Sequence, residues 1–291
     1  MTITIRPTYS RHWLINSEMN PEKKTAGRWY GAYRKIRFTV RKGTLFSFPE
    51  VREADRSAFK GNTPRVVFVN SLILFLLSYL LLKFLDILVT GLAASVNHIP
   101  AHLYYHGVDF LIRGKDWTID AINIVFSSSP LFMLILSGIF TIIYIRVSTE
   151  TGLLRLLLLW SLFHALTGSF GEILVGAIMG KGFGFVILYM FIMDTGKLIL
   201  TISAFLVLFI IGLLLARQAL YSANSYFNIL RSRDCRKFIN MQFLWPFFAG
   251  NLIIALFMIP EVNFFELMVN GTMLLLIIPV IMQSSDRKSV V

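Results

Sequence analysis

The residues best suited to chemistry in this chain are polar side chains placed inside long apolar runs. Asp86, His164, Glu172, Asp194 and Lys197 all occupy such positions. A charged side chain within a bilayer costs about 2.5–3.5 kcal/mol on insertion scales, so each one needs a partner or a water-filled cavity. The sharper of two hypotheses is therefore that these five residues line a polar pocket inside the membrane that opens toward the outer side.

A structural alternative accounts for the same residues. Lys83 precedes Asp86 by three positions, and Lys197 follows Asp194 by three, so each pair can form an ion pair along one helix. His164 can be a neutral core histidine. Under this alternative the polar residues stabilise the helices and bind no solute.

A second candidate site lies between the first two apolar runs. Pro100 fits the first turn of a helix, on which His102, His106 and Asp109 would share one face. Two imidazoles and a carboxylate can bind zinc. A helix at the membrane surface without any metal explains the same residues, and we favour it. Zinc is thus a minor alternative here, and no other cofactor is predicted.

One further segment has the residue spacing of a zinc-protease motif. His164–Gly168 has the length of the H-E-x-x-H motif, but Ala165 replaces the catalytic glutamate and Gly168 the second histidine. An intramembrane enzyme is therefore a lesser alternative, either as a metal-dependent hydrolase or through an acid–base pair formed by Asp194 with Glu172 or His164. The sequence leans against an enzyme.

The elements that must position these residues are transmembrane helices. The 291 residues are 56% hydrophobic and 15% charged, whereas soluble domains average about 45–50% apolar and about 25% charged. About 20 apolar residues cross the hydrocarbon core as a helix. The sequence thus predicts an all-α membrane protein, a polytopic bundle of six transmembrane helices. The six spans lie near residues 66–92, 121–145, 153–179, 183–216, 243–259 and 264–282.

Two features of the third and fourth runs predict local structure. The run 183–216 would be about 51 Å long as one helix, which exceeds the bilayer thickness. We expect it to break at Asp194–Lys197, a polar segment that contains glycine. Gly176 and Gly180, with other glycines nearby, predict close packing between the third and fourth helices around a tight turn.

The basic residues predict the orientation. With both termini inside, the inner segments hold 23 of the 28 Lys and Arg residues and the outer connections hold three, as the positive-inside rule requires. We therefore expect a multi-pass protein of the plasma or inner membrane with cytoplasmic termini. It would comprise a basic N-terminal arm (1–65), a transmembrane domain (66–283) and a cytoplasmic tail (284–291).

The N-terminal arm carries its charges around apolar residues at helical spacing. This pattern is typical of an amphipathic helix on anionic lipids of the inner leaflet; a short strand also fits it. The same charges suit nucleic acid, but no recognised binding module accompanies them, so we expect none. The candidate lipid contacts are Arg28, Arg34, Lys35, Arg41 and Lys42.

Three classes of function follow from these observations. The first is transport or binding of a small solute through the outward-opening polar pocket. The alternative is a non-enzymatic assembly or scaffold component that binds a protein partner within the bilayer. The intramembrane hydrolase is the second alternative, because it lacks a complete motif.

Overall fold

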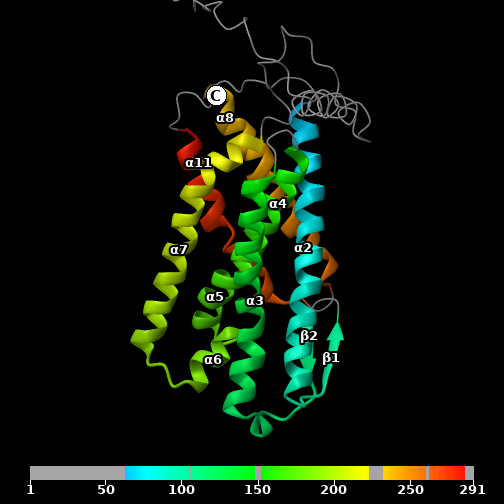
Figure 1. The fold of residues 1–291 in the computed structure, drawn as a ribbon, viewed down its shortest axis with the longest axis vertical. Coiled ribbons are helices and arrows are strands. Elements are labelled where there is room, and N and C mark those ends of the chain that lie inside the picture. Colours follow the sequence, from blue (N-terminus) through cyan, green and yellow to red (C-terminus); the bar gives the residue numbers. More distant parts are fainter. Residues whose placement is uncertain (1–62, 105–106, 148–151, 223–231, 260–261, 286–291) are drawn as a thin grey trace, which may run out of the picture. The chain divides into compact units, whose positions relative to one another are not determined.

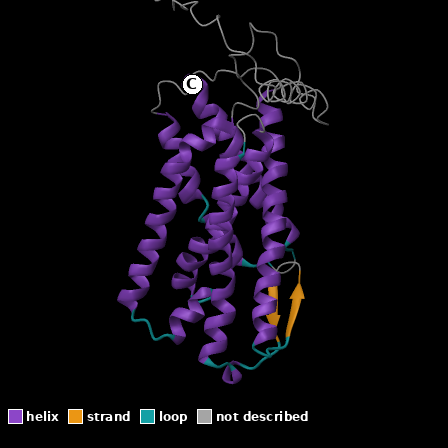
Figure 2. Ribbon diagram, viewed as in Figure 1, coloured by secondary structure: helices purple, strands orange, loops and turns teal. Residues whose placement is uncertain are grey.

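The computed structural model describes five stretches of the chain, and almost all of their residues are helical (Figure 2). The predicted basic arm, including Arg28, Arg34, Lys35, Arg41 and Lys42, lies outside the described residues. Most of the predicted C-terminal tail does so too. The described stretches are residues 63–104, 107–147, 152–222, 232–259 and 262–285.

Within the described residues, six helical segments are long and apolar enough to cross a membrane, as the sequence predicts. In Figure 1 they lie side by side with similar directions, which is the arrangement of a helical bundle. The segments are Pro64–Val96, Ile119–Arg146, Gly152–Met179, Asp194–Leu220, Cys235–Phe257 and Phe264–Gln283.

Several of these segments consist of more than one helix. Short π-helical stretches, Thr167–Gly171 and Asn240–Leu244, join α4 to α5 and α8 to α9. The elements in chain order are α2 (Thr63–Val96), β1 (Ala101–Tyr104), β2 (Gly107–Phe110), α3 (Ile119–Arg146), α4 (Gly152–Leu166), α5 (Glu172–Met179), α6 (Phe183–Tyr189), α7 (Asp194–Tyr221), α8 (Ser232–Ile239), α9 (Trp245–Phe257), α10 (Phe264–Gly271) and α11 (Leu274–Ser285).

The segment after α2 is a β-hairpin, so the prediction of a helix that follows Pro100 is wrong. Strands β1 and β2 pair antiparallel. The hairpin approaches α2 closely at Gly91, where an added Cβ would lie 2.7 Å from Leu103 Cδ2. Ile99 is buried beside Val125 of α3, and Phe110 packs against the same cluster. These tertiary contacts favour extended backbone over the helix that proline spacing alone predicts.

The fourth apolar run does break, but not at Asp194–Lys197. The break lies between α6 and α7, where Phe191 has a positive φ of 53°. Lys197 belongs to the first turns of α7. Helix α6 packs tightly on α5, because a Cβ on Gly184 would lie 2.1 Å from the Gly176 carbonyl oxygen. The predicted close packing around Gly176 is therefore confirmed.

The sixth segment is also interrupted. Helix α10 ends at Gly271, and α11 begins at Leu274 after a turn at Thr272 and Met273. Asn263 caps α10, since its side-chain oxygen accepts a hydrogen bond from the Glu266 backbone N–H. The interruption leaves α10 as a short helix that can present Glu266 to the bundle interior.

Part of the bundle interior is filled by packed aromatic rings. Trp160 and Phe163 of α4 are fully buried, and their ring centroids lie 5.3 and 5.7 Å from that of Phe243. Phe75 of α2 packs edge-on against Trp160 at 4.9 Å. We call Phe75, Trp160, Phe163 and Phe243 the aromatic core.

Candidate functional site: a polar cavity inside the bundle

A cavity of about 250 Å³ lies among α2, α3, α4, α5, α10 and β2. Its apolar walls include Phe110, Phe126, Met133 and Phe265. Polar side chains also line it, which is unusual for the interior of so apolar a bundle. They are Tyr79, Lys83, Asp86, Thr90, Ser129, His164, Glu172, Asn263, Glu266 and Asn270.

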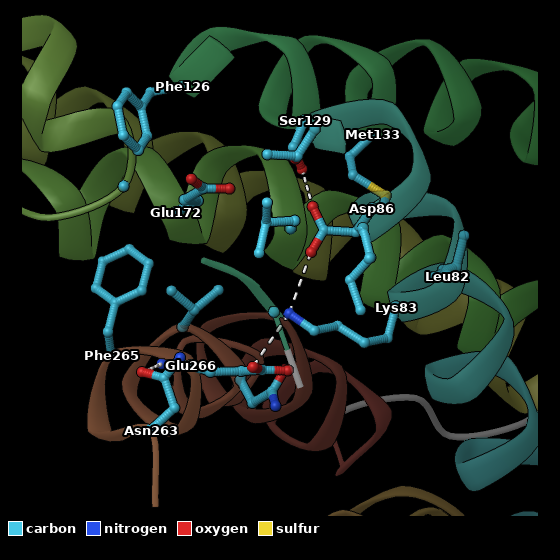
Figure 3. A pocket seen from close by; sticks show the side chains of 18 of the residues that line it. Leu82, Lys83, Asp86, Phe126, Ser129, Met133, Glu172, Asn263, Phe265 and Glu266 are labelled. Atoms are coloured by element: carbon cyan, nitrogen blue, oxygen red, sulfur yellow. Dashed lines mark hydrogen bonds and ion pairs between the residues drawn. The ribbon is translucent and has the colours of Figure 1, made fainter. Parts of the chain in front are cut away.

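Lys83 lies at the centre of a charged network in this cavity (Figure 3). Its Nζ atom is 3.1 Å from Asp86 Oδ2 and 3.1 Å from Glu266 Oε2. The Tyr79 hydroxyl donates a 2.5 Å hydrogen bond to Glu266 Oε1, and the Ser129 hydroxyl donates to Asp86 Oδ1. One lysine is thus shared by two carboxylates, and each carboxylate has a second partner.

Helix α2 positions three members of this network by spacing alone. Tyr79, Lys83 and Asp86 are separated by four and three residues, so they lie on one face of the helix. The ion pair between Lys83 and Asp86 that this spacing predicts is confirmed. The network reaches beyond α2, because Ser129 belongs to α3 and Glu266 to α10. It therefore ties three helices together.

The π-helical stretch brings His164 and Glu172 to the same cavity. Eight residues of regular α-helix would rotate Glu172 about 80° away from His164. A π-helical turn contains roughly one extra residue, which removes most of this rotation. Gly168, within the stretch, lines the cavity between the two side chains. The local change of helix type thus places both side chains on one wall.

The Glu172 carboxylate has backbone contacts but no ion pair in the described part of the chain. It forms a hydrogen bond with the Phe183 backbone. A Cβ on Gly182 would lie 2.9 Å from Glu172 Oε1 and 2.7 Å from Phe265 Cζ. Gly182, with φ of 55°, therefore leaves the space in which this carboxylate and the Phe265 ring meet.

His164 is a buried residue with one unused ring nitrogen. It is 6% exposed, and its ring centroid lies 4.7 Å from Phe75 and 5.7 Å from Tyr79. One nitrogen forms a hydrogen bond with the Phe75 backbone, whereas Nε2 forms none. The core-histidine alternative accounts for the aromatic contacts but leaves Nε2 without a partner beside the cavity.

Two residues of the predicted pocket lie elsewhere. Asp194 and Lys197 do not line the cavity; they form an ion pair with each other at 3.2 Å. The Asp194 side chain is 99% exposed. The chain breaks just before Asp194 and not after it, so Asp194 begins α7 at the end of the bundle. Of the five predicted pocket residues, Asp86, His164 and Glu172 lie together.

The histidines between the first two spans do not form the predicted helical face. His102 in β1 lies directly opposite Asp109 in β2, while His106 falls outside the described residues. Among the residues that are described, no group of three His, Cys, Asp or Glu side chains could hold a metal ion. The described residues therefore do not form the helical face on which the zinc site was predicted.

Six polar residues of the cavity were not predicted from the sequence: Tyr79, Thr90, Ser129, Asn263, Glu266 and Asn270. Glu266 had a usable signal, because it is an acidic residue near the start of an apolar run. Tyr79 lies four residues before Lys83 on the same helix face. No comparable pattern marks Ser129 or Asn270.

Comparison of the chain with protein-family models, with characterised proteins and with solved structures found no match.

Proposed function

We propose that this chain binds a small solute in the polar cavity and moves it across the membrane. The observation that carries the proposal is the presence of three carboxylates, one lysine and one histidine around one cavity in an otherwise apolar bundle. Such groups are costly inside a membrane and commonly mark a substrate or ion pathway.

Interrupted helices next to the cavity support transport over static binding. The α10–α11 interruption lies beside Glu266 and Asn270, and the turn between α5 and α6 contains Gly182 at the cavity wall. Transporters commonly bind substrate where membrane helices are discontinuous, since such helices can shift without disturbing the whole bundle. We assign these two breaks as the moving parts.

We further propose that the protein spans the plasma or inner membrane with both termini in the cytoplasm. Described basic residues at the ends of α3 and α7, Arg146 and Arg217, lie away from the hairpin end of the bundle. The cavity lies nearer the hairpin, because β2 contributes to its wall. Under the positive-inside rule the cavity then faces outward.

A thiol-blocking experiment tests this proposal. The chain has one cysteine, Cys235, which is buried. Val108→Cys places a thiol on the cavity wall, and Leu111→Cys places one just beyond the same hairpin at an exposed position outside the wall. Proteoliposomes containing each full-length variant are offered radiolabelled ethanolamine, glycine, glycerol or lactate, before and after treatment with a bulky maleimide.

We expect the protein to take up at least one of the four solutes above protein-free liposomes. Labelling should abolish this uptake in Val108→Cys and leave it unchanged in Leu111→Cys. Equal inhibition of both variants, or no uptake of any solute, would contradict a transport role for the cavity.

The assembly role is the second candidate, and the Lys83 network favours it. This network links α2, α3 and α10 and would stabilise the bundle without any solute. An assembly component should co-purify with a stoichiometric membrane partner, and maleimide labelling at Val108→Cys should leave that complex intact. The hydrolase alternative gains no support from the described residues.

A further inference from the structure

The cavity carries an imbalance of charge. Asp86 and Glu266 share Lys83, so these three groups together have one negative charge in excess. Glu172 is a further carboxyl group in the same cavity, and no ion pair within the described residues involves it. A carboxylate in an apolar interior is stabilised by an opposite charge. The ligand best suited to this cavity is therefore one that supplies positive charge.

The unpaired histidine nitrogen defines a second requirement. Because His164 bonds the Phe75 backbone carbonyl, its Nδ1 carries the hydrogen and Nε2 is left as an acceptor. A buried acceptor without a donor destabilises the empty protein. Glu172 is likewise an acceptor. A ligand that carries both positive charge and N–H donors would satisfy the two groups.

Aromatic rings complete the wall around Glu172. Figure 3 shows Phe126 and Phe265 on the same side of the cavity as the Glu172 carboxylate. Phe126 is held by the rings of Phe110 and Phe185, with centroids 5.5 and 5.0 Å away. Aromatic faces attract ammonium groups through their quadrupole. A carboxylate with aromatic neighbours is thus a suitable environment for an organic cation.

From these three observations we infer that the solute is a small protonated amine whose ammonium group binds Glu172 and His164 Nε2. This inference rests on the solute-binding role proposed above and names the chemical class of that solute. The buried Asn270 amide, which also lines the cavity, can bind a polar substituent of the amine. Lys83 stays paired with Asp86 and Glu266 and repels a second cation.

Three probes of similar size test the inference: benzylammonium, benzyl alcohol and phenylacetate. Their binding to the full-length protein in lipid nanodiscs is measured by isothermal titration calorimetry. We expect benzylammonium to bind at least tenfold more tightly than the alcohol, and phenylacetate not to bind. Glu172→Gln keeps the shape but removes the charge, and should weaken benzylammonium binding about thirtyfold or more.

Two further variants separate charge recognition from misfolding. Asp194→Asn removes an exposed carboxylate outside the cavity and should leave the affinity unchanged. Phe126→Leu keeps an apolar wall but removes the aromatic face, and should weaken benzylammonium binding about threefold while benzyl alcohol responds less. The size-exclusion profile of each variant should match that of the unmodified chain.

The inference is overturned if benzyl alcohol or phenylacetate binds as tightly as benzylammonium, or if none of the probes binds. Unchanged binding of benzylammonium to Glu172→Gln also overturns it. These results leave the solute-transport proposal standing if labelling at Val108→Cys still blocks uptake. If that block fails while benzylammonium binds through Glu172, the transport role fails and the amine site remains.

Discussion

The aromatic core and the polar cavity are neighbours on α2 and α4, yet the polar side chains that they share with the helices are paired differently. In the core, the Trp160 indole donates to the Ser71 hydroxyl at 2.9 Å, and Ser71 donates in turn to the Gln242 carbonyl. In the cavity, within the described residues, Glu172 has no ion pair and His164 Nε2 has no donor. The Trp160 and Ser71 side chains of the core are thus satisfied by protein partners, whereas the Glu172 carboxyl and His164 Nε2 are left for a ligand.

This difference separates residues that hold the bundle together from residues that can act on a solute. Close packing stabilises a folded state because every atom has neighbours. Unsatisfied polar groups instead lower the stability of the empty protein, and a ligand that satisfies them recovers the loss on binding. The two regions should therefore respond to substitution with effects of different size and sign.

The largest loss of stability is expected in the aromatic core. Phe163→Ala should lower the free energy of unfolding by about 3–5 kcal/mol, because it opens a cavity among rings that cannot collapse fully. Leu154→Ala on the same helix is the control, since Leu154 is exposed on the bundle surface. Denaturant titration in detergent micelles measures both. Equal losses in the two variants would contradict the assignment of a packed core.

Removing the shared lysine should give the next largest effect. Lys83→Met leaves Asp86 and Glu266 without their common cation, and we expect the unfolding free energy to fall by about 2–3 kcal/mol. The double variant Lys83→Met/Glu266→Gln should regain part of this loss, because it removes one of the two stranded charges. The same denaturant titration measures both, and a double variant less stable than Lys83→Met would argue against the shared ion pair.

A smaller loss is expected when one hydrogen bond is removed from the core. Trp160→Phe deletes the indole N–H that binds Ser71 and should cost about 1–2 kcal/mol, from the hydrogen bond and the smaller ring. A double-mutant cycle with Ser71→Ala isolates the hydrogen-bond contribution. Strictly additive losses would mean that the two side chains do not interact.

The smallest effect should have the opposite sign. Glu172→Gln removes a buried ionisable carboxyl that has no ion pair among the described residues, so the empty protein should become more stable by about 0.5–1 kcal/mol. Asp194→Asn, at an exposed position, serves as the control and should leave stability unchanged. Thermal unfolding in the absence of any amine measures both variants. Destabilisation by Glu172→Gln would indicate that Glu172 has a structural role like that of the core residues.

The number of long apolar helices was predictable from the sequence. The candidate site was predictable only in part. Asp86, His164 and Glu172 were expected to lie together, and they do. Glu266 was overlooked because it precedes the long part of an apolar run and has no charged neighbour on its helix. Asp194 was misplaced because residue type indicated a break but did not fix its position.

The hairpin shows a second limit of sequence patterns. The spacing of Pro100 and His102 suits a helix, but contacts of Ile99 and Leu103 with α2 and α3 stabilise strands instead. Such contacts join residues far apart in the chain, and a local pattern contains no information about them. The same applies to Ser129, whose partner Asp86 is on another helix.

The sequence by itself determined that six apolar helices would form, because backbone groups in a lipid environment must be satisfied within each segment. Only the tertiary structure decided which polar side chains meet. A π-helical stretch turns Glu172 toward His164, and a break before α7 moves Asp194 away. The first change rotates a side chain by a fraction of a helical turn, and the second moves the break by about one turn from its predicted position. Periodicity is too coarse to register shifts of that size, and packing between helices fixes them.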